Sequence, residues 1–353
     1  MSFLEEAGHR KSSLNLKDLD LQEMTQLVRT LNQPDYRARQ IMEWLFRHGV
    51  TDLAAMSNLP LSLRQQLAEI AHPGVAEVVA RWQAADGTTK YLLRLSDGET
   101  VECVYMLYSY GATACVSSQV GCRMGCLFCA STIGGKVRDL TCGEMYEQVL
   151  VMNRDQKKKV NRVVVMGIGE PLENYDETLK FIRLLHEPYA LNIGYRRITI
   201  STCGLVPGIK RLAREGIPLT LAVSLHAPND ELRNKIMPIN RQYPLDQLLA
   251  ACREYTEMTH RRVTFEYVLI KGLNDSPECA RELAGLLRGM LCHVNLIPVN
   301  YVPERGLEKP EPRVIAAFQR LLDEAGISVT LRRELGSEIM AACGQLRRSQ
   351  NTR

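Results

Sequence analysis

From about residue 112 onward, the chain alternates short apolar runs with amphipathic helical stretches. The runs are rich in β-branched residues, as is typical of parallel strands buried on both faces. Strands are expected at 113–119, 162–166, 197–202, 219–225, 263–270 and 294–299, with a last strand at 328–332. Helices are expected between them at 143–154, 175–186, 206–214, 245–259, 277–290 and 313–325. This pattern predicts an α/β fold, a partial (β/α)6 TIM-type barrel. A Rossmann sheet is the competing architecture, but no G-x-G-x-x-G sequence follows the first strand.

Two smaller regions precede the barrel. Residues 1–74 carry apolar residues near a 3.6 period and predict a helical accessory domain, with a break at Asn32-Gln33-Pro34 and later helix ends at Pro60 or Pro73. Residues 75–111 alternate with a period of two, and Asp86-Gly87 and Asp97-Gly98 occupy hairpin positions. We therefore expect a short antiparallel β extension, followed by the barrel domain at 112–353.

Composition limits the class of protein. The 353 residues are 45% hydrophobic and 24% charged, which is ordinary for a globular protein. Residues 1–10 show no signal-peptide pattern, and no apolar run reaches the length of a membrane span. Eleven cysteines, an odd number spread along a long chain, do not indicate an extracellular disulfide framework. We expect a reduced, cytoplasmic protein without membrane contact.

Three cysteines, Cys122, Cys126 and Cys129, follow the first expected barrel strand with the spacing C-x3-C-x2-C. Three thiolates can bind three irons of a [4Fe-4S] cluster and leave the fourth iron open to a substrate or cofactor. A structural zinc site is the alternative, but it usually takes four ligands in paired C-x2-C units. No second C-x2-C is present. The spacing therefore favours an iron–sulfur cluster.

Small and polar residues gather at the ends of four expected strands. They are Gly167 to Pro171, Ser201 to Gly204, Ser224 to His226, and Asn300 after Pro298-Val299. The carboxyl ends of parallel barrel strands meet on one face, so these residues should form a polar cup beside the cysteine loop. Glu170 offers a carboxylate for an ammonium group.

The motifs resemble those of radical S-adenosylmethionine (SAM) enzymes, and more closely those of RlmN-type RNA methyltransferases, a family related to the Cfr methylases. The matching stretches are the cysteine loop with Phe128, PDYRARQI at 34–41, CVSSQVGC at 115–122, GIGEP at 167–171, SLHAP at 224–228, MPIN at 237–240 and AACGQL at 341–346. Cys115 and the Cys343 motif separate this family from other radical SAM proteins.

The resemblance implies which residues bind the cofactors. Cys122, Cys126 and Cys129 would bind one [4Fe-4S] cluster per chain. Contacts to SAM would come from Gly169, Glu170, Ser201, Ser224, Leu225, His226 and Asn300.

The resemblance also implies a mechanism for methylating carbon 2 of adenine, an electron-poor C–H position that calls for a radical route. One SAM methylates Cys343, and a second SAM gives the 5′-deoxyadenosyl radical that takes a hydrogen from this S-methyl group. The methylene radical adds to the ring, and Glu102 removes the ring proton. Cys115 then attacks the Cys343 sulfur, which releases methylated RNA and leaves a transient disulfide.

The implied partners are 23S rRNA and tRNA, together with an external one-electron reductant such as flavodoxin or ferredoxin, and we expect a monomer. Basic clusters at 157–159, 261–262, 332–333 and 347–348 offer phosphate contacts, and the N-terminal helical domain could grip folded RNA. A Cfr-like carbon-8 methylase remains the alternative within this enzyme class. A non-catalytic iron–sulfur or zinc-binding module remains the alternative outside it.

Overall fold

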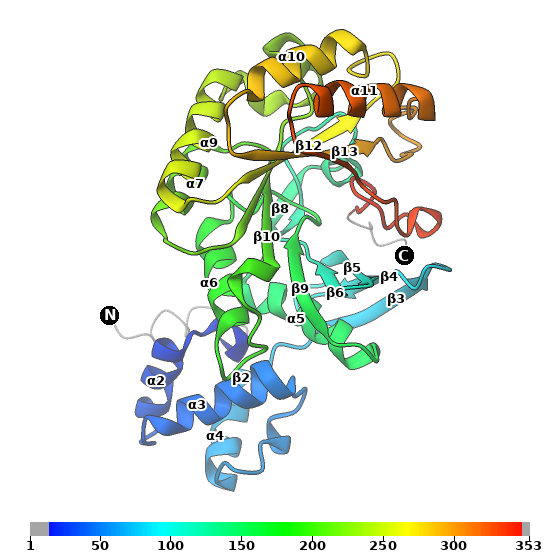
Figure 1. Ribbon diagram of the computed structural model, residues 1–353. Helices are drawn as coiled ribbons and strands as arrows, with labels where there is room; N and C mark the ends of the chain where they lie inside the picture. Colours follow the sequence, from blue (N-terminus) through cyan, green and yellow to red (C-terminus); the bar gives the residue numbers. More distant parts are fainter. Residues whose placement is uncertain (1–13, 348–353) are drawn as a thin grey trace.

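The structure, a computed structural model, describes residues 14–347. Its main feature is a sheet that has ten strands within this range, seven of them parallel neighbours in the order β14-β13-β12-β11-β10-β9-β6 (Figure 1). These strands are β6 (Gly111–Cys115), β9 (Val160–Val165), β10 (Ile198–Thr202), β11 (Thr220–Ser224), β12 (Val263–Leu269), β13 (Cys292–Pro298) and β14 (Val329–Leu331). The partial barrel of six repeats with a flanking last strand is confirmed.

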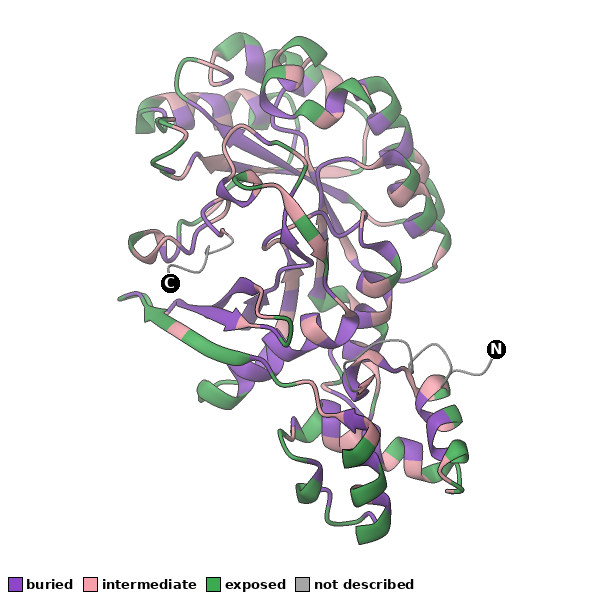
Figure 2. Ribbon diagram, turned by 180° about the vertical axis from the view of Figure 1, so that it is seen from behind, coloured by how far each residue is buried: buried purple, intermediate pink, exposed green. Residues whose placement is uncertain are grey.

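Helices follow the parallel strands and cover the outside of the sheet, while the strands themselves are largely buried (Figure 2). They are α5 (Cys142–Asp155), α6 (Tyr175–His186), α7 (Val206–Arg214), α9 (Leu245–Thr259), α10 (Pro277–Leu287) and α11 (Pro312–Glu324). All six expected helices are present. A further short helix, α8 (Asp230–Ile236), was not expected, and it begins where the Asn229 side chain accepts a hydrogen bond from the Leu232 N–H.

The expected β extension consists of β3 (Glu77–Gln83), β4 (Thr89–Arg94) and β5 (Thr100–Tyr108). Gly87 and Gly98 occupy the two hairpin turns with φ values of 83° and 88°, which glycine adopts without steric cost. Strand β5 pairs antiparallel with β6, from Val104 opposite Cys115 to Tyr108 opposite Gly111. The extension and the barrel therefore share one continuous sheet.

The N-terminal region contains α2 (Leu21–Thr30), α3 (Tyr36–Glu43) and α4 (Leu61–Ile70), and the break at residues 32–34 is confirmed. Two details differ from expectation. The short strands β1 (Leu14–Asn15) and β2 (Ala71–His72) pair in parallel, and Pro60 precedes α4 rather than ending a helix. Proline lacks a backbone N–H, so it is well tolerated at a helix start.

A buried ion pair and a ring contact join the N-terminal region to α5. The Lys17 Nζ donates to Glu147 and to the Gly74 carbonyl, and both charged side chains are almost completely buried. The Tyr146 hydroxyl donates to the Phe46 carbonyl at 3.1 Å, and the two rings meet edge to face. The helix α5 begins at Cys142, shortly after β8 (Lys136–Asp139), the strand that follows the three cysteines, so this contact connects the N-terminal region to the cysteine end of the barrel.

The strand expected at 113–119 is wrong in its second half. Strand β6 ends at Cys115, and residues 119–121 form β7 (Gln119–Gly121), which pairs with β8 (Lys136–Asp139) in a separate sheet. Between them the Ser117 hydroxyl donates to the Glu102 carbonyl, and the Ser117 N–H donates to the Gln148 side chain. These buried side-chain bonds replace strand pairing and turn the chain out of the sheet.

Within residues 14–347, no helix is long and apolar enough to cross a membrane. The expectation about residues 1–10 lies outside the described residues.

Candidate active site

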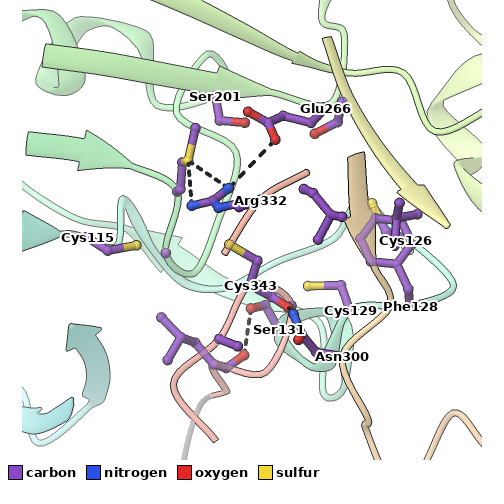
Figure 3. Close-up of a pocket in the computed structure, with 18 of the residues that line it drawn as sticks. Cys115, Cys126, Phe128, Cys129, Ser131, Ser201, Glu266, Asn300, Arg332 and Cys343 are labelled. Carbon is purple, nitrogen blue, oxygen red and sulfur yellow. Dashed lines mark hydrogen bonds and ion pairs between the residues drawn. The ribbon is translucent and has the colours of Figure 1, made fainter. Parts of the chain in front are cut away.

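A cavity of about 440 Å³ opens at the carboxyl ends of the parallel strands. Most of the expected site residues line it: Cys115, Cys122, Cys126, Cys129, Gly169, Glu170, Ser201, Ser224, His226, Asn300 and Cys343. Figure 3 shows Cys115, Cys129 and Cys343 in this cavity, with Cys343 coming from a distant part of the chain. Two expected residues, Leu225 and Glu102, do not line it.

The cluster loop, residues 121–130, is shaped mainly by backbone hydrogen bonds. The Cys122 N–H donates to the Gly135 carbonyl at 3.1 Å, and the Leu127 N–H donates to the Ile236 carbonyl at 2.9 Å. Gly125 has a φ of 73°, and a Cβ there would lie 3.3 Å from Pro238. The MPIN stretch at 237–240 therefore packs against the cluster loop, which gives that motif a structural role.

The three cluster-loop cysteines, Cys122, Cys126 and Cys129, all line the cavity. No three His, Cys, Asp or Glu side chains in the described part of the chain converge as the ligands of a single metal ion. A structural zinc usually takes four ligands, whereas three thiolates can bind three irons of a [4Fe-4S] cluster. The donor set therefore fits an iron–sulfur cluster better than a structural zinc. All eleven cysteines have free thiols, so the Cys115–Cys343 disulfide is absent from this conformation.

Arg233 in α8 holds the turns that follow β10 and β11. Its completely buried guanidinium donates to the carbonyls of Cys203, Ser224 and Leu225, and to the Asn240 side chain, at 2.8 to 3.1 Å. Backbone carbonyls removed from water need such partners, because an unpaired buried acceptor is costly. Leu225 thus contributes its carbonyl to the scaffold while its side chain is buried away from the cavity. Sequence reasoning missed Arg233, although it lies between two family motifs.

Glu170 is buried and is held by backbone donors. One carboxylate oxygen accepts the Leu172 N–H at 3.0 Å, and the other accepts the Cys203 N–H at 2.7 Å. Burial raises the pKa of Glu170, and these hydrogen bonds oppose the rise. The carboxylate therefore links the ends of β9 and β10, in addition to facing the cavity.

His226 is also fixed by the fold. It has a φ of 60°, its Nδ1 accepts the Val268 N–H at 2.9 Å, and its ring meets Phe128 edge to face at 4.8 Å. Burial lowers the pKa of His226 to about 3. The imidazole is therefore neutral at physiological pH and supports the cluster loop through Phe128.

Cys343 lies in the carrier loop, residues 335–347, which leaves β14 and crosses the cavity mouth. The Asn300 amide donates to the Cys343 carbonyl at 2.9 Å, and the Ser131 hydroxyl donates to the Leu346 carbonyl at 2.7 Å. The Ala130 N–H donates to the Gly344 carbonyl at 2.7 Å. Cys343 is thereby held at the edge of the cluster loop. Its distant partner Cys115, at the end of β6, faces the same cavity (Figure 3).

Glu102 in β5 lies behind the carrier loop. Its side chain is buried, ion-paired with Lys90 at 3.1 Å, and accepts the Arg347 N–H at 2.9 Å. Burial raises the pKa of Glu102, while Lys90 and the Arg347 N–H lower it. In this conformation the carboxylate does not reach the cavity where a substrate atom would lie.

Arg332 is the main cavity residue that sequence reasoning misplaced. As part of the 332–333 cluster it was expected at a phosphate-contacting surface, but its guanidinium lies inside the cavity, 3.7 Å from the buried Glu266 carboxylate. Figure 3 shows Arg332 close to Cys343. Burial and the neighbouring Cys343 raise the pKa of Cys115 to about 12, and Arg332 opposes this. Arg332 directly follows β14 at the carboxyl end of the barrel, and this place after a strand was the signal available in the sequence.

In the other basic clusters, some side chains bond within the protein and others are exposed. Arg261 donates to the Leu219 carbonyl, Lys159 donates to the Asn153 carbonyl, and Arg347 pairs with Glu304. Lys157, Lys158, Arg262 and Arg333 are exposed. Arg348 lies outside the described residues.

Comparison with known proteins places this site in a family. Residues 116–284 match the model of the radical SAM superfamily, and residues 14–72 match that of the ribosomal RNA large subunit methyltransferase N-terminal domain. A probable dual-specificity RNA methyltransferase RlmN from Symbiobacterium thermophilum is 54% identical over 94% of this chain and 91% of its own length. Another, from Desulforudis audaxviator, is 57% identical over 88% of this chain and 98% of its own length.

A crystal structure of a radical SAM methyltransferase from Sphaerobacter thermophilus has the same fold, with a TM-score of 0.91. It is 48% identical and covers 94% of this chain and 99% of its own. The sequence matches, the shared fold and the three-cysteine cavity all point to the same family. The chain belongs to the RlmN family of radical SAM RNA methyltransferases.

Proposed function

We propose that this enzyme methylates carbon 2 of adenine in 23S rRNA and tRNA, with Cys343 as the methyl carrier. The observation that carries the proposal is that Cys115 and Cys343 open into the same cavity as the three cluster-loop cysteines. A resolving thiol and a carrier thiol must come within reach of each other and of the cofactors. In support of this, Cys115 at the end of the first barrel strand, β6, and Cys343 after the last strand, β14, line one cavity.

Cys122, Cys126 and Cys129 would hold a [4Fe-4S] cluster, and the strand-end residues Gly169, Glu170, Ser201, Ser224, His226 and Asn300 would surround SAM. When bound, these cofactors supply a methyl group for Cys343 and a radical that removes one hydrogen from it. Leu225 would act through its backbone, since its side chain is buried elsewhere. The apolar ring of Phe128 and the buried His226 help to exclude water from this side of the cavity.

Cys343 presents its sulfur to the cavity while Asn300 holds its carbonyl. Once the carrier carbon is joined to the adenine ring, the radical adduct would give up one electron to the cluster and the ring proton to Glu102. The Cys115 thiolate then forms a bond to the Cys343 sulfur as the bond between this sulfur and the transferred carbon breaks. The transferred methylene carbon keeps the electron pair of the broken bond, takes up a proton to become a methyl group and leaves with the RNA. The resulting disulfide must be reduced before the next cycle. Arg332 offers the positive charge that favours a thiolate in this cavity.

An adenine ring edge can reach the cavity only if the base is unpaired or flipped out of its stack. Lys157, Lys158, Arg262 and Arg333 are candidate phosphate contacts. The match of residues 14–72 to a ribosomal RNA methyltransferase domain supports a role in RNA binding for the N-terminal region. An external electron donor such as flavodoxin or ferredoxin, a monomeric state and a cytoplasmic location complete the proposal.

Nucleoside mass analysis of RNA treated with the reconstituted enzyme and isotopically labelled SAM tests this function. Labelled 2-methyladenosine is expected in 23S rRNA and tRNA. Appearance of 8-methyladenosine without 2-methyladenosine would show a Cfr-like enzyme instead. The Cys343→Ala variant should bind its cluster and transfer no methyl group, and methyl transfer by this variant would refute the carrier role.

A further inference from the structure

We propose that Lys90 is a positioning residue that couples the proton acceptor Glu102 to the position of the carrier loop. The inference rests on the methyl-carrier function proposed above. Lys90 is a buried lysine that was not among the site residues expected from the sequence. It lies in β4, the strand of the β extension next to β5, which carries Glu102.

Strand pairing brings Lys90 and Glu102 to the same face of the sheet. Leu92 of β4 is opposite Glu102 of β5, and Lys90 is opposite Val104, so Lys90 and Glu102 are diagonal neighbours. This face packs against the carrier loop, because Val104 and Met106 share an apolar cluster with Leu335, Ala341 and Leu346. A lysine in such a place is unusual, since ammonium groups are rarely buried without a partner.

The Lys90 ammonium makes three contacts that connect the two parts. It lies 3.1 Å from Glu102 Oε1, donates to the Met340 carbonyl at 3.3 Å, and lies 4.8 Å from the centre of the Trp82 ring. The side chains of Lys90 and Glu102 are only 9% and 4% exposed. The ammonium thus bonds the proton acceptor and the carrier-loop backbone at the same time.

The carrier loop occupies the other carboxylate oxygen as well. Glu102 Oε2 accepts the Arg347 N–H at 2.9 Å, so both oxygens are engaged, one by Lys90 and one by the loop itself. A general base must come within hydrogen-bond reach of the proton it removes. Glu102 is outside the cavity, so it can act only after residues 340–347 move away from it.

Lys90 links the movement of the carrier loop to the state of Glu102. When the loop shifts, the bonds from Lys90 to Met340 and from Arg347 to Glu102 break together, and Lys90 remains with Glu102 as its counter-ion. The retained ammonium keeps a buried carboxylate ionised, as a proton acceptor must be. Glu102 would therefore be shielded while Cys343 receives its methyl group and become available when RNA displaces the loop.

The first experiment needs no RNA and no turnover. Hydrogen exchange of the amides at 341–347 is measured in the cluster-loaded full chain for the wild type and for Lys90→Met. Loss of a charge-assisted bond should raise exchange by about tenfold or more. The matched control is Lys180→Met, which removes a lysine paired with Glu23 in the N-terminal region and should leave exchange in this loop unchanged. Unchanged exchange in Lys90→Met would overturn the proposed coupling.

The second experiment follows single turnovers with RNA. In Lys90→Met, S-methylation of Cys343 should stay within about twofold of wild type, whereas decay of the RNA–protein adduct should slow by about tenfold or more. The pH profile of this decay should move to higher pH and return in Lys90→Arg. A residue with a merely structural role would slow both steps alike and leave the profile in place, and this result would refute the proposal.

The two experiments separate this inference from the proposed function. If the wild type methylates no RNA, the function fails, while the exchange measurement still decides whether Lys90 holds the loop. If the wild type methylates RNA and Lys90→Met resolves its adduct at the wild-type rate, the function stands and the Lys90 inference fails. Lys90→Gln, also neutral, supplies both measurements if the methionine variant does not fold.

Discussion

The cluster loop and the carrier loop line the same cavity but are held in different ways. The cluster loop is fixed by backbone hydrogen bonds, several of them to residues within 15 positions, such as the bond from Cys122 to Gly135. The carrier loop is fixed largely by side chains from distant elements, with sequence separations of 215 residues for Ser131 to Leu346 and 245 for Glu102 to Arg347. Backbone bonds thus hold the cluster loop, whereas several side chains from distant elements hold the carrier loop.

The free energy that holds the carrier loop in place depends on its side-chain hydrogen bonds. A single side-chain hydrogen bond contributes only about 1 kcal/mol net, so a loop held by a few such bonds can be displaced by a binding partner. A methyl carrier that must meet SAM and then RNA needs this mobility, whereas a cluster ligand does not. The predictions below test the difference, beginning with the largest expected effect.

Replacing a cluster-loop cysteine should remove all chemistry. Cys126→Ala is expected to lose the iron–sulfur cluster, and with it both 5′-deoxyadenosine formation and methyl transfer, because one of three thiolate ligands is gone. Iron analysis, visible absorbance and product assays measure this. The control is Cys252→Ala, which changes a buried cysteine of α9 outside the cavity and should keep the cluster. A full iron content in Cys126→Ala would contradict the assignment.

Replacing the resolving thiol should stop the cycle at a later point. Cys115→Ser is expected to retain the cluster and the S-methylation of Cys343 but to accumulate a covalent RNA–protein adduct, since serine does not form a disulfide. Denaturing gel electrophoresis with labelled RNA detects the adduct. Rapid release of methylated RNA by this variant would show that another group resolves it.

Arg233 tests the scaffold beneath the strand ends. Arg233→Met should lower the free energy of unfolding by about 3 kcal/mol, because it leaves several buried carbonyl groups without a donor. Denaturant titration measures the change. Arg241→Met, at an exposed position, should stay within about 0.5 kcal/mol of wild type. Equal losses of unfolding free energy in the two variants would show that Arg233 does not stabilise the strand-end turns.

His226, which packs against Phe128 of the cluster loop, should make the stability of the protein depend on pH. Its pKa falls from the ordinary value of 6.5 to about 3 on folding, so the unfolded chain binds the proton more tightly. Stability is therefore unaffected above pH 6.5 and is lost as pH falls from 6.5 toward 3, by up to about 1.4 kcal/mol per pH unit. Thermal unfolding of wild type and His226→Gln across this window isolates the effect. Parallel curves for the two proteins would exclude it.

The smallest expected effect concerns a single anchor of the carrier loop. Ser131→Ala removes the bond to the Leu346 carbonyl and should loosen the loop by about 1 kcal/mol, which corresponds to a roughly fivefold rise in alkylation of Cys343. The iron content should not change, because the cluster loop keeps its backbone bonds. A loss of iron in this variant would mean that the two loops are not independent.

The sequence by itself determined the barrel and the cluster loop. Strands such as β9 and β12 are mostly apolar runs rich in β-branched residues, and the cysteine spacing is a local pattern, so neighbours along the chain carry the information. The same local rule failed at 116–118, where bonds from Ser117 to Glu102 and Gln148 end the strand. It also failed at Pro60, where one residue could equally end one helix or begin another.

Only the tertiary structure decided where the distant groups meet. Arg332, Arg233 and Lys90 are charged residues that local pattern assigns to a surface. Arg233 and Lys90 are nevertheless buried and Arg332 is half-buried, because partners from other strands and loops cover them. Likewise, Glu102 fits the role of proton acceptor by resemblance, but the fold places it behind the carrier loop. Burial and long-range hydrogen bonds depend on how elements pack. The contacts of the Lys90 ammonium with the Glu102 carboxylate and the Met340 carbonyl therefore leave no periodic trace in the sequence.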